Sequence, residues 1–350
     1  MDLNEEARPF VGAAALRVLG LLLAAVLTMW PMVTAAWASP AVVVPVGRAV
    51  GIKLFSDGVV VVGTSEVAGE GGKVNPARDC GLREGDIITH INSTEVDTIE
   101  EVSALLQELE GQPMSIRAIR DEKQVQLTAT PVLCPADGAY KLGAWIRDSM
   151  AGIGTVTFYD PSTGAFGALG HGINDADTAL LMPLESGSIL PATVAGVEKG
   201  RSGAPGQLQG VFDTASTLGL LRANTSGGVF GTLTEPRWAD GAAVQVAERD
   251  EVKPGPAEIL CNISGDRVDK FQVEIAKVYA EREGDCRDYL LKVTDQRLLD
   301  ATGGIVQGMS GSPILQNGKI VGAVTHVMVD DPTSGYGIYV GRMLSLDGAA

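Results

Sequence analysis

Residues 308–326 form the stretch GMSGSPILQNGKIVGAVTH, which is the most specific structural signal in this chain. Glycines on both sides of Ser310 permit a tight, strained turn that exposes the serine hydroxyl. The same turn can aim the backbone N–H groups of Gly308 and Ser310 at one point, which is the geometry of an oxyanion hole. Pro313 then leads into a strand, and Asn317-Gly318 predicts a hairpin into the next strand. The stretch therefore predicts a nucleophilic serine beside a β-hairpin.

This layout resembles the nucleophile turn of trypsin-like serine proteases, in which G-D-S-G-G-P is followed by a two-stranded hairpin. Met309 and Ser312 depart from that pattern. The resemblance implies that Ala323-Val324-Thr325 pairs with the substrate backbone. It also implies that Gly335–Val340 is the strand that closes a barrel.

A nucleophilic serine needs a general base, and the chain contains three histidines. His171 is the best candidate, because it lies between two glycines at the end of a predicted strand. It precedes Ser310 by 139 residues, so that two barrels could each supply one member of the pair, in the His-first order of trypsin-like enzymes. His326 is the rival, although its place in a strand favours a structural or subsite role. His90 lies on a strand and is expected to be structural.

The third member of a catalytic triad is not fixed by spacing, because aspartate is common and only geometry defines its place. The candidates are Asp295, Asp213, Asp175 and Asp177. Asp295 could equally cap the turn that follows its strand.

Four cysteines, Cys80, Cys134, Cys261 and Cys286, are widely separated, and the chain has neither C-x-x-C nor H-E-x-x-H. No metal or cofactor is therefore predicted. Free thiols and a Cys261–Cys286 disulfide both remain open, because pairing depends on geometry and on the redox compartment.

Residues 45–130 form a second unit with its own pattern. A capping box of Thr98 and Glu101 predicts the start of a helix, and alternating residues predict strands at 50–54, 58–62, 115–120 and 124–127. The segment CGLREGDIITHINS, residues 80–93, closely resembles the signature of a bacterial PDZ domain. This resemblance implies capture of an extended peptide, with its carboxylate held by the backbone of the loop residues Val50, Gly51 and Ile52. Alternatively, Gly51 only makes a turn and the groove is empty or self-occupied.

Longer motifs carry a family resemblance. The segments ALGHGINDADT (168–178), KPGPAEIL (253–260) and VTDQRLLDATGGIVQGMSGSPILQNGKIVGAVTH (293–326), together with the PDZ unit, closely resemble the SpoIVB peptidase family of endospore-forming bacteria. The resemblance implies a mainly β protein with a PDZ domain at 45–130 and a trypsin-like double β-barrel serine protease domain at 135–348. It places the catalytic roles on His171, Ser310 and Asp295.

The same resemblance implies a serine endopeptidase that the forespore secretes into the space between two membranes. There it would cut itself and cleave a regulatory subunit of an intramembrane protease complex, which triggers sigma-K activation. The competing hypothesis is a non-catalytic extracytoplasmic PDZ adaptor on a degenerate protease scaffold, because a fold alone does not prove activity.

The N-terminal residues 1–38 are expected to direct the chain out of the cytoplasm. Residues 18–38 form an uncharged run of 21 residues, which is long enough to cross a bilayer. Ala36-Trp37-Ala38 fits a signal-peptidase site, so a cleaved signal peptide and a membrane anchor both remain open. Residues 39–350 are expected to be extracytoplasmic, with self-cleavage in a flexible linker at about 39–50.

Composition agrees with this interpretation. The net charge of −16 argues against a nucleic-acid-binding protein with a broad basic face. The 44 glycines and the low aromatic content of 5% favour many tight turns between Val-rich and Ile-rich strands.

Overall fold

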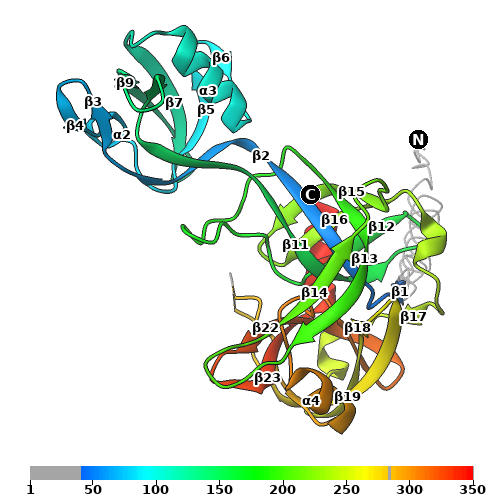
Figure 1. Cartoon of the computed structure of the whole chain (residues 1–350). Coiled ribbons are helices and arrows are strands. Elements are labelled where there is room, and N and C mark those ends of the chain that lie inside the picture. The colour runs from blue at the N-terminus through cyan, green and yellow to red at the C-terminus, as the bar shows by residue number, and fades with distance from the viewer. Residues whose placement is uncertain (1–40, 283–284, 350) are drawn as a thin grey trace, which may run out of the picture. The chain divides into compact units, whose positions relative to one another are not determined.

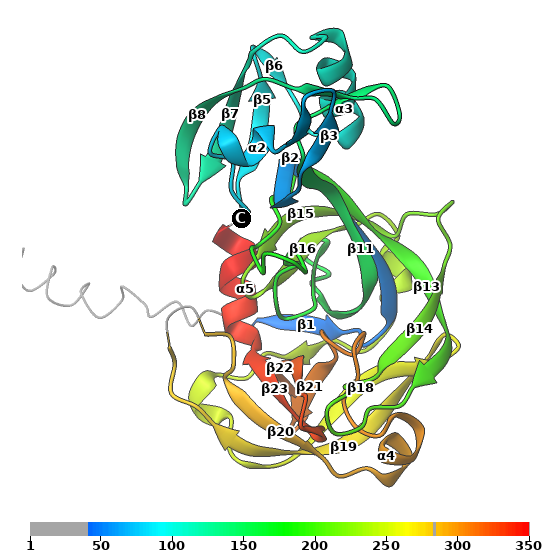
Figure 2. The ribbon, with the colours of Figure 1, turned by 60° about the vertical axis from the view of Figure 1, so that its left-hand side comes forward.

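The structure is a computed structural model that describes residues 41–282 and 285–349 (Figures 1 and 2). The predicted signal or anchor segment at 18–38 lies outside the described residues. Within the described ranges, no helix combines the length and the hydropathy needed to span a membrane. Strands make up most of the regular structure, which confirms the prediction of a mainly β protein.

The first barrel is a ring of six strands that closes because β2 pairs with both β13 and β11. Buried residues such as Val50, Phe166 and Val229 fill its interior. Its strands, in ring order, are β2 (Ala49–Thr64), β11 (Ala144–Tyr159), β12 (Ala165–Ala168), β16 (Gly228–Leu233), β15 (Gly219–Thr225) and β13 (Ser186–Glu198). The ring is part of a 13-stranded sheet. Beside the barrel this sheet contains β1 (Val42–Pro45), β17 (Val244–Gln245) and β14 (Gln207–Phe212), and its other four strands belong to the module described below.

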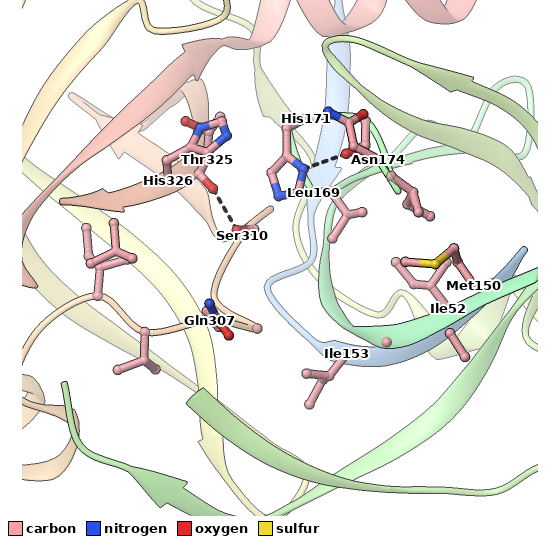
Figure 3. Close-up of a pocket in the computed structure, with 18 residues that line it drawn as sticks. Ile52, Met150, Ile153, Leu169, His171, Asn174, Gln307, Ser310, Thr325 and His326 are labelled. Atoms are coloured by element: carbon pink, nitrogen blue, oxygen red, sulfur yellow. Dashed lines mark hydrogen bonds between the residues drawn. The ribbon is translucent and has the colours of Figure 1, made fainter. Parts of the chain in front are cut away.

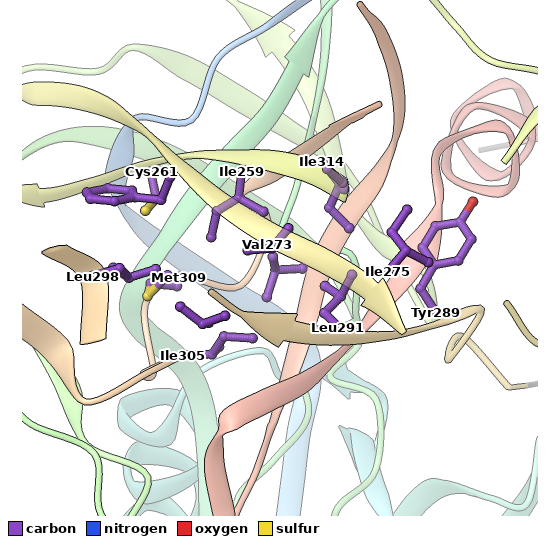
Figure 4. Packing of buried hydrophobic residues seen from close by; sticks show 14 of the residues in the cluster. Ile259, Cys261, Val273, Ile275, Tyr289, Leu291, Leu298, Ile305, Met309 and Ile314 are labelled. Carbon is purple, nitrogen blue, oxygen red and sulfur yellow. The ribbon is translucent and has the colours of Figure 1, made fainter. Parts of the chain in front are cut away.

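The second barrel is also closed and has six strands. Along β19, buried Phe271, Val273 and Ile275 alternate with exposed Gln272 and Glu274, because successive side chains of a strand point to opposite faces. Figure 4 shows the resulting hydrophobic core. The strands, in ring order, are β18 (Gly255–Ser264), β19 (Arg267–Val278), β20 (Tyr289–Val293), β23 (Asp331–Tyr339), β22 (Lys319–Met328) and β21 (Pro313–Gln316). The predicted double β-barrel is confirmed.

The hairpin predicted at Asn317-Gly318 joins β21 to β22. Both residues have positive φ, at 53° and 78°, as a two-residue turn of type I′ requires.

The module that the sequence predicts as a PDZ domain, here called the PDZ module, has its own core, which includes Val59, Ile88, Ile116 and Leu106. The predicted capping box is present: the Glu101 N–H donates to the Thr98 hydroxyl, and the Thr98 N–H donates to the Glu101 carboxylate. The module contains the second half of β2, then β3 (Val67–Gly69), β4 (Gly72–Val74), α2 (Pro76–Asp79), β5 (Ile87–Ile91), β6 (Thr94–Glu95), α3 (Ile99–Glu108), β7 (Met114–Arg120), β8 (Lys123–Ala129), β9 (Val132–Cys134) and β10 (Ala139–Lys141).

The PDZ module is inserted into the first barrel. This arrangement differs from the expected one, in which a PDZ domain at 45–130 precedes a protease domain at 135–348. Residues 49–55 of β2 pair with β11 and β13 of the barrel, whereas Val59 and Val60 of the same strand pair with β5 of the module. The two strands expected at 50–54 and 58–62 are therefore one continuous strand. The linker expected at 39–50 is also corrected, because residues 42–45 and 49–50 are paired strand residues rather than flexible chain.

The C-terminal helix α5 (Val340–Ala349) joins the two barrels. Its residues Val340 and Met343 share a buried cluster with Phe158 and Phe230 of the first barrel and Ile338 of the second. The remaining helical elements are α4 (Gln296–Thr302) and the short 3₁₀ helices η2 (Pro236–Trp238) and η3 (Arg249–Glu251).

Candidate active site

The nucleophile turn is anchored by Met309, the residue that departs from the trypsin-like pattern. Its side chain is fully buried in the core of the second barrel, where it clusters with Leu298 and Ile305 (Figure 4). Because Met309 points into the barrel, the adjacent Ser310 is left half-buried and lines a cleft.

The first barrel binds this turn directly through Thr155 of β11. The Thr155 N–H donates to the carbonyl of Ser310 at 3.0 Å, and the Thr155 hydroxyl donates to the carbonyl of Gly308 at 2.8 Å. Gly311 lies so close to β11 that a Cβ on it would overlap the Thr155 carbonyl and lie 2.6 Å from the Leu169 nitrogen. This contact places the serine beside the chain that carries His171.

The predicted oxyanion hole has free donors. Gly308 has a φ of +96°, which a glycine adopts without strain. In the described part of the chain, the N–H groups of Gly308 and Ser310 donate to no acceptor, whereas the N–H groups of Met309 and Gly311 bond to Val306 and Val324. Two unpartnered N–H groups in one turn are available for a developing oxyanion.

His171 follows β12 by way of two residues with positive φ, Leu169 at 67° and Gly170 at 70°. Its Nδ1 lies 2.8 Å from the carbonyl oxygen of Gly172. A carbonyl can only accept, so Nδ1 carries the proton and Nε2 of the neutral ring has the free lone pair. In this structure a backbone carbonyl, rather than the carboxylate found in many triads, fixes the tautomer and orientation of the ring.

The serine hydroxyl donates to the carbonyl oxygen of Thr325 at 2.6 Å, as Figure 3 shows. Among the described residues, Ser310 and His171 share no hydrogen bond, but both side chains line the same cleft. For catalysis the hydroxyl must turn from Thr325 to the base, and catalytic hydrogen bonds commonly tighten only when substrate binds.

The cleft has a volume of about 400 Å³ and lies between the two barrels. Its lining contains no Lys, Arg, Asp or Glu. The first barrel and the loop after His171 contribute Ile52, Met150, Ala151, Gly152, Ile153, Leu169, His171, Gly172, Ile173 and Asn174, and the second barrel contributes Ile305, Val306, Gln307, Gly308, Ser310, Thr325, His326 and Val327.

His326, the rival base, lies next to His171. The two ring centroids are 5.0 Å apart, and the ring planes make an angle of 36°. Removal of water from the ring, together with the neighbouring His171 and Arg287, lowers the pKa of His326 to about 4. His326 is therefore neutral at physiological pH. Its backbone is part of β22, at the edge that faces the cleft.

Burial also lowers the pKa of His171, and the hydrogen bond to Gly172 only partly offsets this effect. We expect kcat/KM to fall on acidification with a midpoint below about 6.5, the ordinary value for histidine, since only the neutral ring accepts a proton. A pH–rate profile from pH 4 to 8 measures this midpoint. The acid limb should persist in His326→Gln, and a wild-type midpoint above 7 would contradict the assignment of the base.

Comparison with known proteins agrees with this geometry. The family model described as SpoIVB peptidase S55 matches residues 138–344, and the PDZ domain model matches residues 73–120. The chain belongs to the SpoIVB peptidase family. It is a serine peptidase, and the predicted PDZ domain is confirmed.

Solved structures resemble parts of this SpoIVB-family chain. The Rv3671c protease of Mycobacterium tuberculosis, in its active form, is 14% identical over 57% of this chain and 73% of that chain, with a TM-score of 0.31. The PDZ domain of the SdrC-like protein Lmo2051 of Listeria monocytogenes is 23% identical over 26% of this chain and 87% of that chain, with a TM-score of 0.21. No curated protein matches the chain. Family membership rests on the family model.

The structure does not bring Asp295, the triad member that the SpoIVB resemblance implied, to His171. Asp295 is the N-cap of α4, where its carboxylate accepts from the N–H of Arg297 and of Gln272. The Arg297 guanidinium lies 2.8 Å from the carboxylate and lowers the pKa of Asp295 to about 2. Asp295 is not among the residues that line the cleft, and it makes no contact with His171 in the described chain. Its carboxylate stabilises the start of a helix.

The other aspartates weighed from spacing do not contact His171 either. Asp213 is exposed and caps its own turn through Ala215 and Ser216. Asp175 and Asp177 both pair with Arg147. The residue that sequence reasoning missed is Gly172, since a backbone carbonyl leaves no mark in the sequence beyond the glycine-rich motif around His171.

The structure also corrects the peptide-binding loop expected at Val50, Gly51 and Ile52. These residues lie in the middle of β2, paired with β11 on one side and β13 on the other. Val50 and Ile52 are buried, and a Cβ on Gly51 would meet the ring of Phe212 at 2.6 Å. Their N–H groups belong to a barrel strand, so they cannot form a carboxylate-binding loop.

The four cysteines Cys80, Cys134, Cys261 and Cys286 are free thiols. Among the residues that the structure describes, no cluster of three His, Cys, Asp or Glu side chains could hold a metal ion.

Proposed function

We propose that this SpoIVB-family peptidase cleaves peptide bonds with Ser310 as the nucleophile and His171 as the general base. Nε2 of His171 takes the hydroxyl proton as Oγ attacks the carbonyl carbon, and the N–H groups of Gly308 and Ser310 stabilise the oxyanion. The imidazolium then protonates the leaving amine, and a water molecule hydrolyses the acyl-enzyme with the same base. The observation that carries this proposal is the shared cleft of Ser310 and His171, with two free N–H donors at the serine.

The substrate is proposed to bind as an extended strand along β22. β21 pairs with β22 only as far as Ala323, and Thr325, His326 and Val327 line the cleft beyond that point. An extended chain can therefore add to this edge. A substrate N–H that bonds to the Thr325 carbonyl would compete with Ser310 for that acceptor and release the hydroxyl to His171.

The side chain before the scissile bond is proposed to be apolar. Its carbonyl must reach the N–H of Gly308, so its side chain falls between residues 305–308 and the β22 edge. Ile305, Val306 and Val327 line this part of the cleft without a charged partner. Such a lining suits aliphatic side chains.

A peptide mixture incubated with the full-length protein, followed by mass spectrometry of the products, tests this function. We expect cuts mainly after Ala, Val, Ile or Leu, because a buried charge in the cleft would have no partner. The Ser310→Ala variant is the matched control and should produce no cuts. Cleavage mainly after Lys, Arg, Asp or Glu, or cleavage that persists in Ser310→Ala, would overturn the proposal.

The PDZ module is proposed to capture an extended peptide, or a segment of this chain, on the free edge of β11. Over residues 144–148 one edge of β11 pairs with β2, and the other has no strand partner among the described residues. Helix α3 is bonded to the last residue of this segment and to the chain just before it. The Ile99 N–H donates to the Asp148 carboxylate at 3.0 Å, and the Gln107 side chain bonds to both backbone groups of Tyr140 in β10. An open strand edge beside a helix is suited to β-augmentation.

The biological role proposed for the chain is that of a secreted sporulation peptidase. The forespore would export it into the intermembrane space, where the N-terminal segment either anchors it or is removed. There it would cut itself and cleave the regulatory subunit that restrains pro-sigma-K processing. Support comes from the family model over residues 138–344 together with the PDZ module. Transcription that depends on sigma-K, measured in a sporulating host carrying Ser310→Ala in place of the active chain, tests this role, and unchanged timing would refute it.

A further inference from the structure

Arg147 lies on β11 where this strand passes from the PDZ module into the first barrel. Its backbone is paired with Val60, and the β2–β11 register shifts directly after it, between Arg147 and Ser149. Its guanidinium is largely covered and donates to two carboxylates of another segment, those of Asp175 and Asp177, the latter at 2.8 Å. The side chain therefore links β11 to the loop that follows His171.

The buried carboxylate of Asp175 stabilises that loop through hydrogen bonds. The residue is 1% exposed, and its carboxylate accepts from the N–H of Asp177 at 3.0 Å, the N–H of Thr178 at 2.8 Å and the Thr178 hydroxyl at 3.0 Å. In the described part of the chain, Arg147 is the one positively charged group that contacts it. A buried carboxylate without its cation is strongly disfavoured, so the loop conformation depends on Arg147.

The same loop sets the position of the Gly172 carbonyl, which orients the base. Next to Gly172, the Ile173 N–H and carbonyl both bond to the Asn224 side chain, at 2.8 and 2.9 Å. Gly172 itself is tightly packed, because a Cβ there would lie 2.6 Å from the Thr225 carbonyl oxygen. Asn224 on one side and the Arg147–Asp175 pair on the other thus hold the short segment between His171 and Asp175.

We propose that Arg147 is a positioning residue that acts through Asp175 to hold the Gly172 carbonyl against His171, and that it couples peptide binding at the β11 edge to catalysis. The second part rests on the proposed function of that edge. The chain connection is short: residues 144–148 form the free edge, and Met150, Ala151, Gly152 and Ile153 of the same strand line the catalytic cleft. A peptide that pairs with the edge bonds to the backbone immediately around Arg147.

The test uses full-length protein and compares Arg147→Met and Arg147→Lys with Asp177→Asn, a matched control that removes only the exposed partner of the same guanidinium. We expect Arg147→Met to lower kcat by about 10- to 100-fold with little change in KM, because a small displacement of the base costs this much. Its acid-limb midpoint should rise toward the ordinary histidine value as water reaches the loosened ring. Arg147→Lys should recover part of the loss, and Asp177→Asn should stay within about twofold of wild type, as expected for an exposed ion pair.

A second variant, Asp175→Asn, provides an independent test if Arg147→Met does not fold. It removes the ion pair and leaves an amide of the same shape. It should show the same loss of kcat and the same shift of midpoint as Arg147→Met. Unchanged kcat and midpoint in a folded Arg147→Met or Asp175→Asn would overturn the inference.

Coupling is measured by adding an extended peptide with a free C-terminal carboxylate. Its binding at the β11 edge is followed through the fluorescence of Trp145, which is 62% exposed on that strand. Such a peptide should change the rate at which a fluorophosphonate labels wild-type Ser310 and leave the rate for Arg147→Met unchanged, although both proteins bind it. Equal changes of the labelling rate in the two proteins would refute coupling through Arg147. If the peptide does not bind the wild type, both the proposed binding at the β11 edge and the coupling are refuted. A wild-type chain that neither cleaves nor labels would refute the proposed function itself and this inference with it.

Discussion

Replacement of His171 with alanine should lower kcat/KM by about four orders of magnitude or more, whereas replacement of Asp295 with alanine should leave it within about threefold of wild type. The difference follows from the contacts. His171 lines the cleft with Ser310 and is oriented by the Gly172 carbonyl. Asp295 is bound to Arg297 and to the first turn of α4. Steady-state kinetics on a peptide substrate measures both effects.

Stability must be measured beside activity for these two variants. Loss of the Asp295 N-cap should cost about 1 kcal/mol of the free energy of unfolding, which thermal unfolding can detect. Asp213→Ala is the matched control, because Asp213 caps an exposed turn and is not part of the cleft. A folded Asp295→Ala variant as inactive as His171→Ala would show that the carboxylate reaches the base during catalysis, and the orienting role assigned to Gly172 would be wrong.

The Gly311→Ala substitution should abolish activity and destabilise the chain by about 3 kcal/mol, since the strain of a positive φ and an overpacked contact each cost about 1–3 kcal/mol. Gly311 has a φ of +97°, and its Cβ position is occupied by the backbone of Thr155 and Leu169. A methyl group there would push the nucleophile turn away from the first barrel. Denaturant unfolding and probe labelling of Ser310 measure the two losses.

Gly318→Ala separates backbone strain from the clash. Gly318 has a φ of +78°, but no atom lies within 4 Å of its Cβ position. This variant should lose only about 1 kcal/mol, the cost of the left-handed backbone, and should keep its activity. If Gly311→Ala lost no more stability and activity than Gly318→Ala, the close contact between the turn and β11 would not be needed to bring Ser310 and His171 together.

Local features of the chain were predictable from sequence because they depend on neighbouring residues. The hairpin at Asn317-Gly318 and the capping box at Thr98 each need only a few consecutive residues, and both are present. The nucleophile turn belongs to the same class, since its geometry follows from the glycines around Ser310. The burial of Met309 in the barrel core was not predicted, although an apolar residue in this turn is itself a signal of such packing.

The differences between expectation and structure concern residues whose roles depend on distant partners. Val50–Ile52 has the apolar-glycine-apolar pattern of a carboxylate-binding loop, but β13, more than 130 residues later in the chain, pairs with it instead. The same pattern occurs at Leu142-Gly143-Ala144, directly at the free edge of β11, and would have been the better candidate. For Asp295, the sequence Asp-Gln-Arg is compatible with both a helix cap and a triad, and only tertiary placement decides between them.

The proposed catalysis depends on Ser310 being an activated nucleophile in a cleft shared by two barrels. The most direct measurement is intact-mass analysis of the wild type, Ser310→Ala and His171→Ala, each with and without a fluorophosphonate probe. We expect one probe adduct on the wild type, no adduct on Ser310→Ala, and strongly slowed labelling of His171→Ala. An adduct on Ser310→Ala, or equal labelling of His171→Ala and the wild type, would contradict the proposed catalysis.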